Sequence, residues 1–158
     1  MERRAEERGL SIELATGEGK DFYGRILAVE HRSWKGPERT GLMNAEMRLF
    51  YAALLRRLQA RGRLRLRFAR LDGEDIGYIA GGVIGDQYRG LQFSFDDRYR
   101  DLAPGNLMQA VEIDALIADG FRVYDLGIDI PYKARWADER VETSTLIVRP
   151  HALPRTPR

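Results

Sequence analysis

The chain has 158 residues, of which 44% are hydrophobic and 32% are charged, a composition typical of one soluble globular domain with a sizeable core. It contains no cysteine, which excludes a disulfide framework, a thiolate nucleophile and a cysteine zinc site, and its two histidines disfavour a His-rich metal site. The longest nearly apolar stretch, 77–85, is about half of what a bilayer span requires. The charged start, MERRAEERG, lacks the apolar run of a signal peptide. These features predict a cytoplasmic protein with no membrane span and no metal.

The charge of the chain is nearly balanced, with a net value of +2, which gives no basic field of the kind that nucleic-acid binding requires. The 26 cationic residues nevertheless include only three lysines, Lys20, Lys35 and Lys133, and the rest are arginines. This bias has two interpretations, a GC-rich coding sequence or a set of planar guanidinium groups that meet phosphates. Any chemistry that depends on a lysine has only these three candidates.

The N-terminal half predicts one strand and three helices. In chain order these are a charged, linker-like helix over 1–9, a strand over 11–15, a helix over 22–32, a Gly/Pro loop over 33–41 and a helix over 44–60. Asp21 is placed to cap the helix that begins at Phe22. The helix over 44–60 carries an apolar stripe that we expect to face the core, formed by Met47, Phe50, Tyr51, Leu54, Leu55 and Leu58.

The apolar period then changes from 3.6 to 2 and predicts an antiparallel meander. Its strands are expected over 63–70, 75–84 and 87–95, with Asp72-Gly73 as the first hairpin turn. After a polar loop follow a helix over 107–118, a strand over 122–127, a short helix over 132–137, a last strand over 141–148 and a flexible tail over 151–158. The order β-α-α-β-β-β-α-β-α-β predicts an α/β fold with a mixed, mostly antiparallel sheet flanked by helices.

Two polar features of this fold have alternative interpretations. The loop before the helix over 107–118 contains Pro104-Gly105-Asn106, and the free N–H groups of a helix start suit a pyrophosphate, although such a loop is often only structural. The arginines at 63, 65 and 67 alternate with apolar residues, so we expect them on a solvated sheet face. If that face binds a partner, tRNA is the partner to consider.

Several motifs, in this order, resemble one branch of the GNAT acyltransferases, the branch of the cellulose-biosynthesis acetyltransferases and the Fem-type aminoacyl transferases. They are EHRSWKG at 30–36, Tyr99 before the loop Ala103-Pro104-Gly105, and YDLG at 124–127 followed by Asp129, Tyr132-Lys133 and Trp136. The resemblance covers about residues 10–148, and we expect the GNAT-like domain over 10–150. Ala103 departs from the serine that is common in the family.

The resemblance implies acetyl-CoA or another acyl-CoA as co-substrate, with no metal. The pantetheine arm is expected along the strand over 87–95, where a glycine, Gly90, either marks a bulge or is tolerated for packing. A backbone N–H of this strand would hold the thioester oxygen. The implied cofactor-binding residues are Phe93, Ser94, Phe95, Leu102, Ala103, Pro104, Gly105 and Asn106.

Transfer to an amine needs a base and a group that holds or protonates the thiolate. The implied catalytic residues are Asp129, Asp125 and Tyr132. Each also has a structural interpretation, such as a helix cap for Asp129 and packing for Tyr132. The implied substrate-binding residues are Glu30, which is also a candidate base, Trp34, Lys35 and Lys133.

These residues predict an N-acyltransferase that moves an acyl group, expected to be acetyl, from acyl-CoA to a primary amine by direct attack in a ternary complex. The acceptor is either a small molecule or a cell-envelope amine. One alternative is a transferase that uses aminoacyl-tRNA. Another is a non-catalytic half of a tandem protein, since the helix over 1–9 resembles the joint between two such domains. A second GNAT-like domain is therefore a candidate partner.

Overall fold

The computed structural model describes residues 9–16 and 21–148. The chain divides into two compact units, the first up to residue 128 and the second from residue 129. The predicted helix over 1–9, except for Gly9, and the predicted tail over 151–158 lie outside the described residues. The described elements are β1 (Ser11–Leu14), α2 (Phe22–Arg32), α3 (Lys35–Glu38), η1 (Gly41–Met43), α4 (Ala45–Ala60), β2 (Leu64–Leu71), β3 (Glu74–Ile84), β4 (Gln87–Phe95), η2 (Asp97–Leu102), α5 (Pro104–Ala118), β5 (Val123–Asp125) and η3 (Pro131–Arg135).

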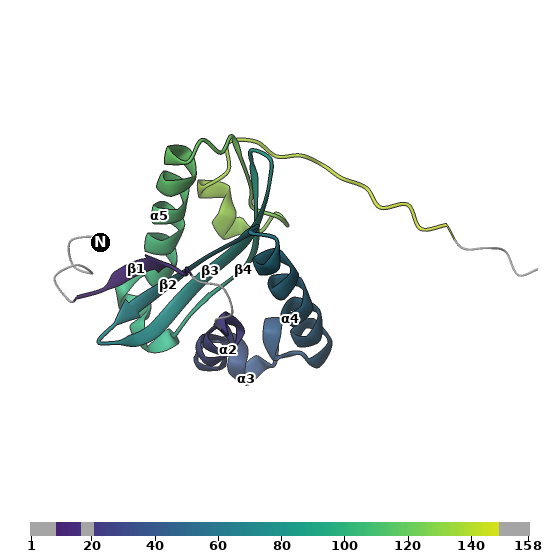
Figure 1. Ribbon diagram of the computed structural model, residues 1–158. Helices are drawn as coiled ribbons and strands as arrows, with labels where there is room; N and C mark the ends of the chain where they lie inside the picture. Colours follow the sequence, from purple (N-terminus) through teal and green to yellow (C-terminus); the bar gives the residue numbers. More distant parts are fainter. Residues whose placement is uncertain (1–8, 17–20, 149–158) are drawn as a thin grey trace, which may run out of the picture. The chain divides into compact units, whose positions relative to one another are not determined.

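The first unit is built on a five-stranded mixed sheet with the order β1-β2-β3-β4-β5. The first four strands pair antiparallel, and β5 runs parallel to β4. Asp72 and Gly73 form the predicted turn between β2 and β3, both with positive φ (50° and 80°), as a two-residue hairpin of type I′ requires. Helices α2, α3 and α4 cover one face and α5 covers the other (Figure 1). The predicted mixed α/β sheet flanked by helices is confirmed.

The face below α2 and α4 holds the larger part of the core. Asp21 caps α2 as predicted, because its carboxylate accepts the Gly24 N–H at 3.2 Å. The helix buries Phe22, Ile26 and Val29 against the sheet, and it also buries Glu30 completely. The remaining members of this cluster are Leu42, Leu55, Leu66, Phe68, Tyr78 and Ala80.

The apolar stripe predicted for α4 is only partly in the core. Leu55 is buried, but Met47 and Phe50 are 40% and 57% exposed. The helix packs against the sheet from Tyr51, whose hydroxyl donates to the Leu91 carbonyl at 3.4 Å, to Leu58, which lies beside Gly82. The predicted loop over 33–41 is also wrong in part, because the short helix α3 forms within it.

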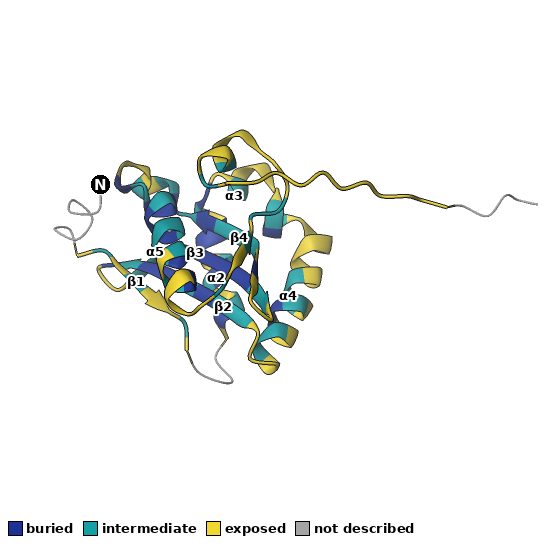
Figure 2. Cartoon of the chain, turned by 90° about the horizontal axis from the view of Figure 1, so that it is seen from above, coloured by how far each residue is buried: buried dark blue, intermediate teal, exposed yellow. Residues whose placement is uncertain are grey.

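The opposite face corrects the prediction of a solvated arginine face for two of its three residues, since Arg63 is exposed as predicted but Arg65 and Arg67 are not. The side chains of Arg65 and Arg67 are only 12% and 11% exposed, because α5 lies over them. Both guanidinium groups donate to the carboxylate of Glu112, a fully buried residue of α5, and Arg65 also donates to Asp119 at 2.7 Å. The alternation of arginine and apolar residues in β2 therefore reflects two buried faces of the strand, one packed in the apolar core and one in ion pairs with α5. Figure 2 shows how far the sheet is enclosed.

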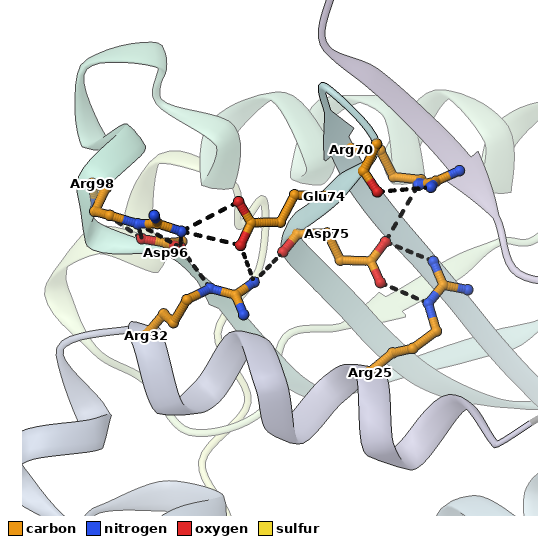
Figure 3. Close-up of polar contacts among 8 residues, drawn as sticks. Arg25, Arg32, Arg70, Glu74, Asp75, Asp96 and Arg98 are labelled. Carbon is orange, nitrogen blue, oxygen red and sulfur yellow. Dashed lines mark hydrogen bonds and ion pairs between the residues drawn. The ribbon is translucent and has the colours of Figure 1, made fainter.

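A second ionic network fastens α2 to the end of the β2–β3 hairpin and to the chain after β4 (Figure 3). Arg25 holds Asp75 with two hydrogen bonds of 2.7 Å. Arg32 donates to Asp96 at 2.8 Å and to the Asp75 carbonyl at 2.6 Å. Arg98 also donates to Asp96, which is fully buried. Burial alone would raise the pKa of Asp96, but the hydrogen bonds from Arg98 and Arg32 outweigh it, and the pKa is lowered.

The second unit contains η3, as a 3-10 helix where a short helix was predicted. The last predicted strand, over 141–148, is not formed. In the described part of the chain these residues belong to no helix or strand, and Val141, Leu146, Ile147 and Val148 are 72–87% exposed. The alternation of apolar and polar residues in this segment fits a strand, but a strand also needs backbone hydrogen bonds to a neighbour. The segment over 141–148 pairs with none of the described strands. None of the described helices is long and apolar enough to cross a bilayer.

Candidate active site

The site begins at the outer edge of β4. β5 pairs only with the first residues of this strand, 87–89, and not with the rest. Within β4 the pairing with β3 shifts between Ala80 and Gly81, which face Gln92 and Gly90, so Leu91 is an extra residue. This bulge lies beside Gly90, as one interpretation of the sequence predicted. Beyond this point no strand in the described part of the chain pairs with the outer edge of β4, which we call the open edge.

The alternation of an antiparallel ladder shows which groups this edge presents. The Asp96 N–H donates to the Ile76 carbonyl at 2.8 Å, so this residue pair points its backbone groups at the neighbouring strand. Counting back along β4, Ser94 and Gln92 also point toward β3, whereas Phe95 and Phe93 point their N–H and C=O groups away from it. The open edge thus presents two N–H groups and two carbonyl groups in one row, and the Phe93 carbonyl accepts from Lys35 Nζ at 2.8 Å.

The start of α5 follows the same edge. Ala103 precedes the helix with a φ of 48°, and no side chain caps the helix. Pro104 at the first position has no N–H, and the N–H groups of Asn106 and Leu107 donate to the Ala103 carbonyl at 3.0 and 3.2 Å. An uncapped first turn carries a partial positive charge that suits an anion.

Gly105 determines how closely α5 packs against β4. It is buried, and a Cβ at this position would lie 2.6 Å from Cζ of Phe93 and 3.4 Å from the ring of Phe95. The glycine therefore allows α5 to lie directly on β4. This contact places the start of the helix beside the open edge. Leu102, also predicted at the site, is buried in the same part of the core.

A buried carboxylate lies on the other face of the sheet. Glu30 of α2 is fully buried and accepts from the Tyr78 hydroxyl and from Lys35 Nζ at 3.1 Å. The Ser33 hydroxyl lies 3.5 Å from the other carboxylate oxygen. Burial, followed by the charge of Glu30, raises the pKa of Tyr78 well above its ordinary value, so Tyr78 is a neutral donor.

Lys35 connects this carboxylate with the open edge of β4. Its Nζ donates to the outward carbonyl of Phe93 at 2.8 Å, and its side chain is 14% exposed. Two of the residues predicted to bind substrate, Glu30 and Lys35, are thus brought together with Phe93. Trp34 lies next to them in the chain and is 46% exposed. Tyr78 was missed as a site residue, because in sequence it is one more apolar position of a central strand.

Ser94 is buried on β4, and its hydroxyl has no hydrogen-bond partner among the described residues.

Asp125, at the end of β5, pairs with Arg89 and accepts the Gly127 N–H at 2.8 Å, with about half of its side chain exposed. These contacts fix the carboxylate at the turn after β5.

The remaining candidates belong to the second unit. Asp129 pairs with Arg140 at 2.9 Å, and both side chains are more than half exposed. Tyr132 and Lys133 lie on η3. Partial burial raises the pKa of Tyr132, so the phenol is protonated at neutral pH and is a donor.

An open strand edge beside an uncapped helix start is an arrangement that receives an extended ligand ending in phosphate groups. The comparisons with known proteins agree with this class. A model of the family described as the acetyltransferase (GNAT) domain matches residues 1–134, so the chain belongs to this family. The chain is therefore an enzyme of the acyl-CoA-dependent N-acyltransferase class.

Solved structures show the same fold at low sequence identity. An aminoglycoside acetyltransferase from an uncultured soil metagenomic sample, in complex with sisomicin, is 13% identical with a TM-score of 0.62, over 92% of this chain and 99% of that chain. The PaiA N-acetyltransferase from Thermoplasma acidophilum, in complex with coenzyme A, is 18% identical with a TM-score of 0.55, over 70% and 75%. AAC(6')-Iy, in complex with a bisubstrate analogue, is 11% identical with a TM-score of 0.58, over 90% and 99%. A search of curated proteins found no match.

Proposed function

We propose that the chain transfers an acetyl group from acetyl-CoA to a primary amine, by direct attack of the amine in a ternary complex. The observation that carries this proposal is the unpaired edge of β4 beyond the bulge, next to the uncapped start of α5. The edge suits the amides of a pantetheine arm, which would add to the sheet as a further strand. The start of α5 suits the pyrophosphate at the other end of the same ligand.

The backbone of β4 supplies electrostatic help for the reaction in this proposal. The outward N–H groups of Phe93 and Phe95 are fixed by the sheet before any ligand binds. Either can donate to the thioester oxygen as negative charge develops on it. Preorganised donors of this kind contribute most when they need no rearrangement during the reaction.

Asp129 is the proposed base that takes a proton from the attacking ammonium, and Tyr132 the proposed donor to the thiolate. Among the three candidate carboxylates, Glu30 is fully buried and hydrogen bonded, and Asp125 accepts from Arg89 and Gly127. The Asp129 and Asp125 side chains are about equally exposed, at 53% and 51%, and Asp129 pairs with an exposed arginine. Asp129→Asn should lower turnover about 100-fold or more and leave coenzyme A affinity unchanged. Unchanged turnover would remove Asp129 from the mechanism.

The acceptor in this proposal is a small-molecule or cell-envelope primary amine, and a second GNAT-like domain remains a proposed partner. The alternative of an aminoacyl-tRNA donor keeps only Arg63 of its three candidate arginines at the surface, since α5 covers Arg65 and Arg67 and Glu112 accepts from both. The single non-catalytic alternative, a binding half of a tandem protein, is an outcome of the experiment below.

The proposal is tested by titrating coenzyme A and acetyl-CoA into the full chain by calorimetry. We expect saturable binding with a Kd below about 1 mM. Asn106→Asp is the matched variant, because it adds one negative charge to the first turn of α5, where acidic residues favour the helix itself. It should weaken coenzyme A binding about tenfold through repulsion of the pyrophosphate and leave the thermal unfolding temperature unchanged or higher. Absence of heat and of thermal shift at millimolar ligand would overturn the proposal.

A further inference from the structure

The ammonium group of Lys35 is bound to a backbone carbonyl at the open edge of β4, which is an unusual position for a cation. The Phe93 carbonyl to which Nζ donates at 2.8 Å points away from β3, toward the open edge. Along that edge the carbonyl is flanked by the outward N–H groups of Phe93 itself and of Phe95. The ammonium therefore covers an acceptor that lies between two donors. This stretch of edge, from Phe93 to Phe95, becomes rich in donors and positively charged.

The ammonium is held firmly in this place. Besides the Phe93 carbonyl it donates to Glu30 at 3.1 Å, and Glu30 is fixed in turn by the Tyr78 hydroxyl. The stem of Lys35 is packed against Gly41, where an added Cβ would lie 3.1 Å from the lysine Cδ. The burial of Glu30 excludes water from its side of the ion pair. A donor fixed in this way needs no rearrangement to meet a developing charge.

An ammonium group has three protons to donate. Two acceptors, Glu30 and the Phe93 carbonyl, take two of them among the described residues. The side chain is 14% exposed, so part of Lys35 reaches the protein surface, and neither of these two contacts uses the third proton. We infer that this third N–H of Lys35 is a donor to the thioester carbonyl oxygen, which makes Lys35 a catalytic residue of the oxyanion site on β4. The inference rests on the proposed function.

The step balances without proton transfer by Lys35. The amine nitrogen bonds to the thioester carbon, and the carbonyl π electrons move to oxygen. They return as the carbon–sulfur bond breaks, and coenzyme A leaves as the thiolate. The proton lost by the amine goes to the base of the proposed function. Lys35 keeps its protons and stabilises the oxygen through one charged hydrogen bond, which is stronger than a neutral one.

The chain offers a matched control on the other face of the sheet. Arg67, like Lys35, is a nearly buried cation that donates to a fully buried glutamate, and its side chain is 11% exposed. Its partner Glu112 lies on α5, and its guanidinium is remote from the edge groups because β2 and β4 are separated by β3. Lys35→Met and Arg67→Met therefore remove comparable ion pairs, only one of which touches the edge.

The first readout is the carbonyl ¹³C signal of labelled acetyl-CoA bound to each protein, which needs no acceptor. Stronger hydrogen bonding to the oxygen moves this signal downfield. We expect a downfield shift on binding to the wild type and to Arg67→Met, and a smaller one with Lys35→Met. Lys35→Arg, which keeps the charge and the donors, should restore part of it. An equal shift in Lys35→Met and the wild type would overturn the inference.

The second readout is thiol release from acetyl-CoA with hydroxylamine as a small nucleophile. Lys35→Met should lower kcat about 100-fold, the usual effect of losing one oxyanion donor, while coenzyme A affinity changes less than about threefold. Arg67→Met should leave kcat unchanged. Acetylation of Lys35 itself, seen by mass spectrometry, would overturn the inference, because Lys35 would then be a nucleophile. If the wild type binds no coenzyme A, the proposed function fails first, and this calorimetric result distinguishes the two failures.

Discussion

Glu30 and Glu112 are both fully buried glutamates, each on a helix that covers one face of the same sheet. Glu112 accepts from two arginines of β2, in the middle of the sheet. Glu30 accepts from a tyrosine of β3 and from a lysine that continues to the open edge of β4. A buried carboxylate paired with a cation thus joins a helix to the middle of the sheet on one face, and on the other face it extends to the open edge of β4. The difference lies in where the cation ends.

The largest expected effect is on the closed face. Glu112→Ala leaves Arg65 and Arg67 buried without their acceptor, and should lower the free energy of unfolding by about 3–5 kcal/mol. Chemical denaturation measures this change. Asp114→Ala, an exposed acidic residue on the same helix, is the control and should stay within about 0.5 kcal/mol of the wild type. Equal effects of the two variants would contradict the role of Glu112.

The corresponding change on the open face should affect two properties. Glu30→Gln weakens the hold on Lys35, so we expect a loss of stability of about 2–3 kcal/mol and also a lower kcat for acetyl transfer. Glu112→Gln should reduce stability alone. Measuring denaturation and thiol release for both variants checks the contrast. An equal loss of kcat in both variants would contradict the contrast, because it would mean that Glu112 affects the reaction as much as Glu30 does.

Asp96 extends the comparison to pH. Its folded pKa is below the ordinary value, so its contribution to stability is complete above about pH 4 and is lost as the pH falls through the folded pKa. Asp96→Asn should cost about 2–3 kcal/mol at pH 7, because Arg32 and Arg98 lose a charged acceptor. As the pH falls below the ordinary aspartate pKa of about 4, the difference between variant and wild type should shrink. Unfolding curves between pH 2 and pH 7 test this, and a difference that grows on acidification would contradict the sign.

Gly105 tests how closely α5 must lie on β4. Gly105→Ala introduces a Cβ that would be 2.6 Å from the Phe93 ring, and should destabilise the protein by about 1–3 kcal/mol. Phe93→Leu shortens the opposing side chain, so the double variant should recover part of this loss. Thermal or chemical denaturation of the four proteins gives the coupling free energy. Strict additivity would exclude the contact as the reason for the glycine.

The smallest effect is expected at the exposed pair Arg89–Asp125, whose side chains are about half exposed. Water screens such a pair, so Asp125→Asn should change the free energy of unfolding by less than about 1 kcal/mol. The same denaturation assay measures it. A loss as large as that of Glu112→Ala would mean that the pair is structurally as important as the buried one.

The fold was predictable where one local signal determined an element. Asp21 marks the start of α2, and the Asp72-Gly73 turn sets the register of β2 and β3. The arginines of β2 were misplaced, because alternation gives two faces and does not say whether the second is covered. The segment over 141–148 has the alternation of a strand but lacks the paired neighbour that makes one.

The separate segments of the site were predictable from the sequence, but the contacts between them were not. The motif around Lys35 and the strand around Phe93 were both identified as candidates, but their hydrogen bond joins residues 58 positions apart. It depends on the bulge at Leu91, which reverses the direction of the backbone groups that follow, and on the packing of α2 against the sheet. No local pattern contains either piece of information. Tyr78 was missed because its role depends on the hydrogen bond from its hydroxyl to Glu30, a residue 48 positions away in the sequence.

The central claim is that the edge of β4 binds the acyl donor, and amide hydrogen exchange resolved by residue tests it most directly. On addition of coenzyme A, the N–H groups of Phe93 and Phe95 should become protected, because they point to the open edge. Those of Gln92 and Ser94 already point to β3 and should change little. A ligand that binds while all four amides keep their exchange rates, or protects them equally, would contradict it.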